Sequence, residues 1–200
     1  MRITLKQAGT FFLVSAIGST GFATQPGFYM GLGIGNSNLH NVPAIVNTTP
    51  PTMTTPTNTG MGGRLFWGVG VSQYFAFEWG YSYYSPSKYS ALNTSAYIRE
   101  NNFDVAGKVM YPLGKWNVFA KGGLAYVFQS VSSALVMSSP GNTVHPEIGL
   151  GVGYNITPSW AVDLSGNRIT KGGGGFQNAD FVALSVSYHW VDAYCGQFLC

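Results

Sequence analysis

Apolar residues alternate with small or polar residues along most of this chain. The segment Tyr74–Tyr83 shows the pattern most clearly, because its odd positions are all aromatic and the even positions between them are Ala, Glu, Gly and Ser. Successive side chains of a β-strand point to opposite faces. This segment is therefore predicted to be a strand with one aromatic face and one face of small or polar residues.

The same period of two recurs in seven further segments, which are residues 28–35, 63–71, 103–111, 116–128, 145–154, 160–167 and 180–190. A water-soluble sandwich would carry many charges on its second face, whereas a narrow barrel needs small side chains inside. Eight strands of about ten residues are typical of a transmembrane barrel. The predicted fold class is all-β: an eight-stranded antiparallel up-and-down transmembrane β-barrel.

Short and long connections alternate between these segments. The short ones are Ser72-Gln73, residues 111–115 and residues 155–158, and the long ones are residues 36–62, 84–102, 129–144 and 168–179. The long links are rich in turn and breaker residues, so we expect loops there. Long extracellular loops and short periplasmic turns are the asymmetry of outer-membrane barrels.

The N-terminal residues 1–23 are predicted to be a cleaved signal peptide. Arg2 and Lys6 precede an apolar stretch over residues 8–18, and Gly21 and Ala23 supply small residues before a cleavage point. The apolar stretch is too short to span a membrane as a helix.

The predicted domain organisation is a barrel over residues 24–190 and a short tail over residues 191–200. The tail holds both cysteines, Cys195 and Cys200, which could form a disulfide in an oxidising compartment.

Composition narrows the class of function. Only 8% of the residues are charged, against roughly 25% in average soluble domains. The 13 Phe, 12 Tyr and 5 Trp exclude a disordered chain. A net charge of +3 over 200 residues gives no basic face for nucleic acid. A lipocalin-like soluble barrel would place its charges outside, which is the reverse of this pattern.

Aromatic residues gather where the predicted strands meet the short turns. They are Tyr111, Trp116, Tyr154, Trp160, Tyr188 and Trp190. Rings with one polar end are common at membrane interfaces, so we predict a periplasmic-side aromatic girdle. Ordinary sheet packing is the alternative interpretation, since aromatic residues favour strands in any case.

Four short motifs occur in the order and spacing of a known family. They are Phe77–Tyr81 (FEWGY), Gly107–Pro112 (GKVMYP), Gly153–Pro158 (GYNITP) and Leu184–Trp190 (LSVSYHW). From about Phe28 to Trp190 the chain therefore resembles the OmpA-like eight-stranded outer-membrane β-barrel family. The resemblance implies a Gram-negative outer membrane, insertion by the barrel-assembly machinery, and Trp190 as the recognition signal. The sequence shows no match to the C-terminal peptidoglycan-binding domain of full-length OmpA.

The alternation places five charged residues on the inward face: Glu78, Lys108, Lys121, Glu147 and Asp163. Unpaired charges in a narrow lumen are costly, so we expect pairing or bound water. The resemblance implies an ion pair between Glu78 and Lys108. The family's second acid falls on Gly153 and its arginine partner on Asp163, so that second pair does not carry over. We hypothesise that Lys121 neutralises Asp163 instead.

One constellation could support hydrolysis. His145 and Glu147 share a face, and four serines precede them in sequence: Ser132, Ser133, Ser138 and Ser139. A base, an acid and a nucleophile within reach are the minimum for such chemistry. Serines are common in loops, however, so we expect no enzyme. The three histidines are scattered in the sequence, and neither a metal site nor a cofactor is expected.

The predicted function is a structural, adhesion-like outer-membrane protein acting through four extracellular loops, with the lumen plugged by side chains. The alternatives are a lipid A-modifying enzyme and a small-solute pore. Expected partners are outer-membrane lipid, lipopolysaccharide and a host or environmental surface ligand. No nucleic acid is expected as a partner, and the expected oligomeric state is a monomer. A polar crown is predicted from Lys88, Arg99, Glu100, Asp104, Arg168, Lys171 and Asp180.

Overall fold

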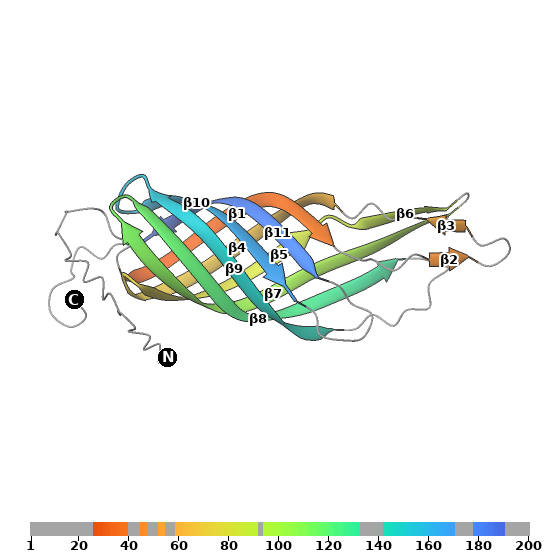
Figure 1. The fold of residues 1–200 in the computed structure, drawn as a ribbon, viewed down its shortest axis with the longest axis horizontal. Coiled ribbons are helices and arrows are strands. Elements are labelled where there is room, and N and C mark those ends of the chain that lie inside the picture. Colours follow the sequence, from red (N-terminus) through yellow and green to blue (C-terminus); the bar gives the residue numbers. More distant parts are fainter. Residues whose placement is uncertain are drawn as a thin grey trace, which may run out of the picture.

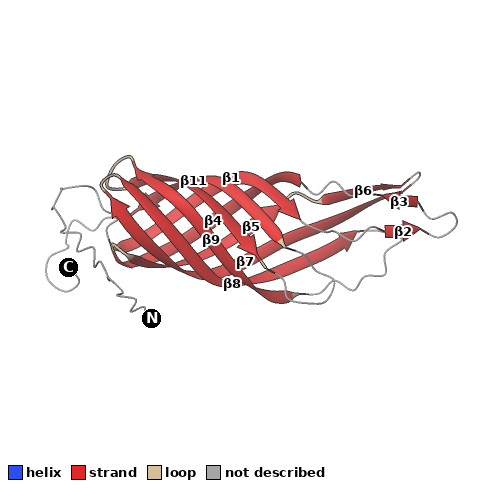
Figure 2. Cartoon of the chain, in the orientation of Figure 1, coloured by secondary structure: helices blue, strands red, loops and turns tan. Residues whose placement is uncertain are grey.

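The computed structural model describes seven parts of the chain, which are residues 26–39, 45–47, 52–54, 59–91, 94–132, 142–170 and 178–190. Tilted strands wrap into a barrel that is closed on itself (Figure 1). Strands and short turns account for the described residues, and none of these residues forms a helix long and apolar enough to cross a membrane (Figure 2).

Eight strands form the wall. They are β1 (Gly27–Leu39), β4 (Thr59–Ser72), β5 (Phe75–Tyr84), β7 (Thr94–Leu113), β8 (Trp116–Ser132), β9 (Thr143–Asn155), β10 (Trp160–Ile169) and β11 (Ala179–His189). Each pairs antiparallel with the next, and β11 pairs back onto β1 to close the barrel. The predicted fold and all eight strands are confirmed. Within the barrel, closure pairs both edges of every wall strand, which is the reason that barrels tolerate an apolar surrounding.

Burial alternates along each strand as the sequence pattern predicts. Across the middle of the wall, Ile34 pairs with Leu184, and Leu184 pairs with Leu164. These three side chains are 66%, 55% and 51% exposed. A water-soluble protein rarely exposes such a continuous apolar surface. The outer wall is therefore built to face a medium other than water.

Inside the barrel, large side chains lie against glycines of neighbouring strands. A Cβ added at Gly31 would overlap the Phe66 ring, and one at Gly151 would overlap the Phe119 ring and approach the Leu164 carbonyl oxygen to 2.8 Å. Eight strands enclose a space that is only just filled by side chains. The glycines on the inward face thus provide the volume that the aromatic residues occupy.

The buried interior changes in character along the barrel axis. Along β8, Phe119 belongs to an apolar cluster, Lys121 is a buried charge, and Ala125 belongs to a second apolar cluster. Near the long-loop end, Tyr84 contacts Phe181 with ring centroids 5.5 Å apart. The lumen therefore holds both apolar clusters and buried charges, and the charge of Lys121 lies between the two clusters along β8.

The long-loop end contains strands where the sequence predicted only loops. Within the predicted link 84–102, β6 (Ser87–Ala91) pairs with the first residues of β7. Within the link 36–62, β2 (Ile45–Asn47) pairs with β3 (Thr52–Thr54). The β6–β7 hairpin and the end of β8 continue beyond the barrel (Figure 1). Backbone pairing sustains these strands without the contrast between an apolar and a polar face that identifies a wall strand.

Two predicted segments lie outside the described residues. They are the signal peptide, residues 1–23, and the tail, residues 191–200, which includes Cys195 and Cys200. Both remain predictions.

Filling an inward glycine should destabilise the barrel. We expect Gly151→Ala to lower the free energy of unfolding by about 1–3 kcal/mol, because the added methyl group overlaps Phe119 and approaches backbone. The matched control is Gly122→Ala on the outward face, where no atom lies within 4 Å of the added Cβ. Its stability should be unchanged or slightly raised. Urea unfolding in lipid vesicles measures both variants, and equal losses would contradict this account of the interior.

Candidate functional site

A network of buried charges occupies the middle of the lumen. Arg64 of β4 donates from Nη1 and Nη2 to the two carboxylate oxygens of Asp104 on β7, both at 2.7 Å. Its Nη2 also donates to Glu78 Oε1 of β5 at 3.3 Å. The planar guanidinium matches a carboxylate with two parallel hydrogen bonds, which fixes its orientation. Arg64 therefore ties three adjacent strands together from within.

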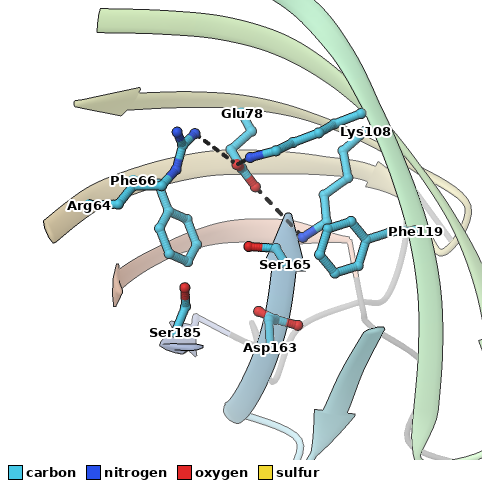
Figure 3. Close-up of a pocket in the computed structure, with 9 residues that line it drawn as sticks. Arg64, Phe66, Glu78, Lys108, Phe119, Asp163, Ser165 and Ser185 are labelled. Atoms are coloured by element: carbon cyan, nitrogen blue, oxygen red, sulfur yellow. Dashed lines mark hydrogen bonds and ion pairs between the residues drawn. The ribbon is translucent and has the colours of Figure 1, made fainter. Parts of the chain in front are cut away.

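Glu78 is the point where the network converges. Besides Arg64, Lys121 Nζ donates to its Oε1 at 3.2 Å, and Lys108 Nζ lies 3.6 Å from its Oε2. The hydroxyl of Tyr29 donates to Oε2 at 3.1 Å. Figure 3 shows Arg64, Glu78 and Lys108 pointing toward one another. A buried carboxylate with several donors avoids the cost of an isolated charge.

Lys108 is held by more than its carboxylate partner. Its Nζ atom lies 4.0 Å from the centroid of the Phe119 ring and 5.6 Å from that of Tyr29. A cation above an aromatic face is attracted by the negative charge density of the ring. The ion pair with Glu78 that the family resemblance implied is therefore present and is supported by two rings.

The expected neutralisation of Asp163 by Lys121 does not take the form of a direct ion pair. Lys121 forms its ion pair with Glu78, and Asp163 makes none of the interactions marked in Figure 3. Among the ion pairs of the described residues, none joins Asp163 to a cation within 4 Å. In register, Asp163 lies beside Gly153 of β9. Lys121 on β8 thus reaches Glu78 on β5, the carboxylate that Arg64 and Lys108 also contact.

The candidate catalytic residues also face the lumen. Glu147 Oε1 lies 3.9 Å from Arg64 Nη1, and His145 Nε2 lies 2.7 Å from Thr143 Oγ1. Both His145 and Glu147 are buried. The side chains of Ser132, Ser133, Ser138 and Ser139 lie outside the described residues. Within the part of the chain that the structure describes, Glu147 lies near a cation and His145 contacts a hydroxyl.

Several polar groups just beyond the charge network have no hydrogen-bond partner among the described residues. They are the side-chain amides of Asn102 and Asn167 and the Oε2 atom of Glu147. Buried polar groups of this kind are ordinarily satisfied by ordered water. Within the described residues, no three His, Cys, Asp or Glu side chains converge as ligands for a metal ion.

The cation at the centre of the network, Arg64, was not among the predicted inward charges, although it alternates with the outward Leu65 and Trp67. Asp104 and Glu100 were assigned to the outer polar crown, yet both are buried on the inward face, and Asp104 is the bidentate partner of Arg64. The signal was the period of two itself, because Asp104 and Glu100 have the same parity as Lys108. The predicted strand began at residue 103, so Glu100 lay outside it and Asp104 lay at its edge, and both were taken as loop charges.

The aromatic residues of the short-turn end lie on the outward face or at strand ends. Trp116 contacts Tyr154 with ring centroids 4.8 Å apart, and Tyr188 lies 5.0 Å from both Trp160 and Trp190. Tyr111 is exposed on the same end of β7. The six residues therefore share one end of the barrel, and their role as a membrane-interface girdle stays a prediction.

Removal of the central cation should cost far more than removal of a surface one. We expect Arg64→Met to lower the free energy of unfolding by about 3–5 kcal/mol, because Asp104 is left buried without its partner. The matched control is Arg168→Met, which breaks an exposed bidentate pair with Asp180. That change should have little effect. The double variant Arg64→Met with Asp104→Leu should recover part of the lost free energy of unfolding. Urea unfolding tests all three, and equal behaviour of Arg64→Met and Arg168→Met would contradict the stabilising role of the network.

Comparison with known proteins agrees with this geometry. An uncharacterized protein of Coxiella burnetii (strain RSA 493 / Nine Mile phase I) is 28% identical over 177 residues, which cover 68% of this chain and 71% of that protein. Neisserial surface protein A is similar in structure with a TM-score of 0.56 at 13% identity, covering 82% of this chain and 97% of the other. The attachment invasion locus protein of Yersinia pestis has a TM-score of 0.52 at 11% identity, covering 83% and 99%. At these identities the two structures show likeness of fold alone.

The family assignment rests on a match that spans most of the sequence. Residues 10–190 match the family described as outer membrane protein beta-barrel domain. The closed eight-stranded wall and its exposed apolar surface are what residence in such a membrane requires. This chain belongs to the outer membrane protein beta-barrel domain family and resides in the outer membrane of a Gram-negative cell.

Proposed function

We propose that this protein is a structural barrel that presents a surface for attachment at its long-loop end, without transport or catalysis. One observation carries the proposal: β7 and β8 continue past the barrel, and β6 adds a further strand to them. The short-turn end carries no comparable extension among the described residues. Binding functions commonly reside on segments that a rigid scaffold projects.

The filled lumen supports a structural role. Arg64, Glu78 and Lys121 join strands on different sides of the interior, and the rings of Phe66 and Phe119 lie beside them (Figure 3). Eight-stranded barrels leave no continuous channel when their interiors are packed. Conduction would require several ion pairs to separate together.

The placement of His145 and Glu147 supports a role without catalysis. Both side chains are buried on the inward face, whereas an acyl chain of the outer leaflet meets the outward face. A lipid substrate would therefore have to enter the lumen to reach them.

Attachment is also the role for which a structural neighbour is named. The Yersinia pestis protein is called attachment invasion locus protein. Transfer of that role to this chain is our proposal, and the ligand would be a host or environmental surface. Trp190 is proposed as the signal for the barrel-assembly machinery. Its amide donates to the Phe28 carbonyl at 2.9 Å, so it lies at the seam that closes the barrel.

Shortening the projecting hairpin should separate attachment from assembly. We expect a variant in which residues 86–98 are replaced by Asn-Gly to fold, because Asn-Gly favours a two-residue hairpin turn and the register of β5 with β7 is retained. Heat-modifiable migration on gels measures folding, and binding of expressing cells to host-cell surfaces measures attachment. A folded variant that attaches as well as the wild type would contradict the attachment role of this hairpin. A control in which residues 171–177 are replaced by Gly-Ser repeats of equal length should keep attachment.

The lumen should not conduct. We expect planar-bilayer recordings of the purified protein to show no large, stable openings, because side chains fill an eight-stranded interior. Empty bilayers and a porin of known conductance serve as the controls. Reproducible openings of the folded protein would instead favour the pore.

A further inference from the structure

The outward face carries a second group of aromatic residues, at the long-loop half of the barrel. Tyr81 on β5 pairs in register with Phe103 on β7, and Phe103 pairs with Tyr126 on β8. In the next row outward, Asn101 lies between Tyr83 and Phe128. We call these six residues the outer aromatic patch. Tyr126 and Phe128 contact each other edge to face with ring centroids 4.8 Å apart.

This patch covers only one side of the barrel. On β1, β9 and β11 the outward residues of the same half carry no aromatic ring: Ile34, Ile148, Val182 and Leu184 are aliphatic, and Asn36 and Asn38 are polar. Hydrocarbon chains alone would give no reason for one side to differ from the other. The asymmetry therefore indicates a neighbour that recognises rings on β5, β7 and β8, three strands that are adjacent in the wall.

The height of the patch identifies the part of the membrane that it meets. Strands rise about 3.3 Å per residue and tilt by about 40°, so the path along β7 from Tyr111 to Phe103 climbs about 20 Å, and the path to Arg99 climbs about 30 Å. The apolar band of such barrels is about 25 Å tall. Phe103 then lies just inside the outer edge of the lipid and Arg99 lies at the level of headgroups.

The cations at that level are arranged differently on the two sides. Arg168 of β10 is committed to Asp180 through two hydrogen bonds of 2.6 and 2.7 Å. Arg99 is exposed directly above the patch. The acidic residue next to Arg99, Glu100, is buried on the other face. The aromatic side of the barrel therefore presents an exposed positive charge, the guanidinium of Arg99.

We propose that the outer aromatic patch and Arg99 form a binding site for one phosphorylated glycolipid of the outer leaflet, of the lipid A type. The guanidinium pairs with a phosphate of the sugar headgroup, since Arg recognises phosphate with parallel hydrogen bonds. The polar side chain of Asn101 lies among the rings at the depth of the sugars. The rings of Tyr126 and Phe128 pack against the first methylene groups of the acyl chains, as aromatic residues do at membrane interfaces. The site does not depend on the proposed attachment role, only on residence in the outer membrane.

Lipid binding to the full-length protein tests the site. Protein extracted from outer membranes and freed of lipid is titrated in detergent with bis-phosphorylated lipid A, and bound lipid is counted by native mass spectrometry. We expect Arg99→Ala to weaken binding about tenfold, the loss of a charge-assisted hydrogen bond. Tyr126→Leu should also weaken it. Arg168→Ala is the matched control, because it removes the same charge from the other side of the barrel, and its binding should match that of the wild type.

Two further lipids define what the site recognises. Dephosphorylated lipid A should bind about tenfold more weakly than the phosphorylated form, and phosphatidylglycerol, which is anionic but lacks the disaccharide, should also bind weakly. Heat-modifiable migration establishes that each variant is folded. Equal losses in Arg99→Ala and Arg168→Ala would overturn the proposal, as would binding that is independent of phosphate or equal for phosphatidylglycerol.

Discussion

The narrow space inside a closed eight-stranded wall is the constraint on which the rest of this structure depends. Side chains that point inward share a volume that they only just fill, so a large residue on one strand requires a small one beside it. Phe119 occupies the space over Gly151, and Phe66 that over Gly31. The high glycine content is thus a packing requirement and not a sign of flexibility.

The same confinement explains the charge network. Water cannot surround a charge in this interior, so neighbouring side chains supply most of the stabilising contacts. Arg64 meets Asp104 and Glu78, and Glu78 also meets Lys108 and Lys121. Because the partners come from different strands, every pair also braces the wall. Because its interior is filled by these contacts, the barrel has only its outer surface and its two ends left for other functions.

The outward face is subject to the opposite requirement. Lipid contacts it everywhere, so aliphatic residues such as Leu164 and Leu184 suffice over most of its area. Departures from that uniform surface are therefore informative. The rings at the short-turn end are predicted, and the patch around Tyr126 with the exposed Arg99 is proposed, to lie where lipid gives way to polar headgroups.

The sequence by itself determined the number of wall strands, their facing and the inward position of residues such as Glu78 and Lys121, because alternation is a local property of a strand. The sequence could not reveal which inward side chains pair with one another across the lumen. Arg64 and Asp104 are 40 positions apart, and they meet because β4 and β7 pair with the two edges of β5 in a curved wall. The β6–β7 hairpin was also not predicted, because backbone pairing beyond the barrel needs no apolar face. Tertiary structure decided the partners because register and closure, unlike alternation, are properties of the whole wall.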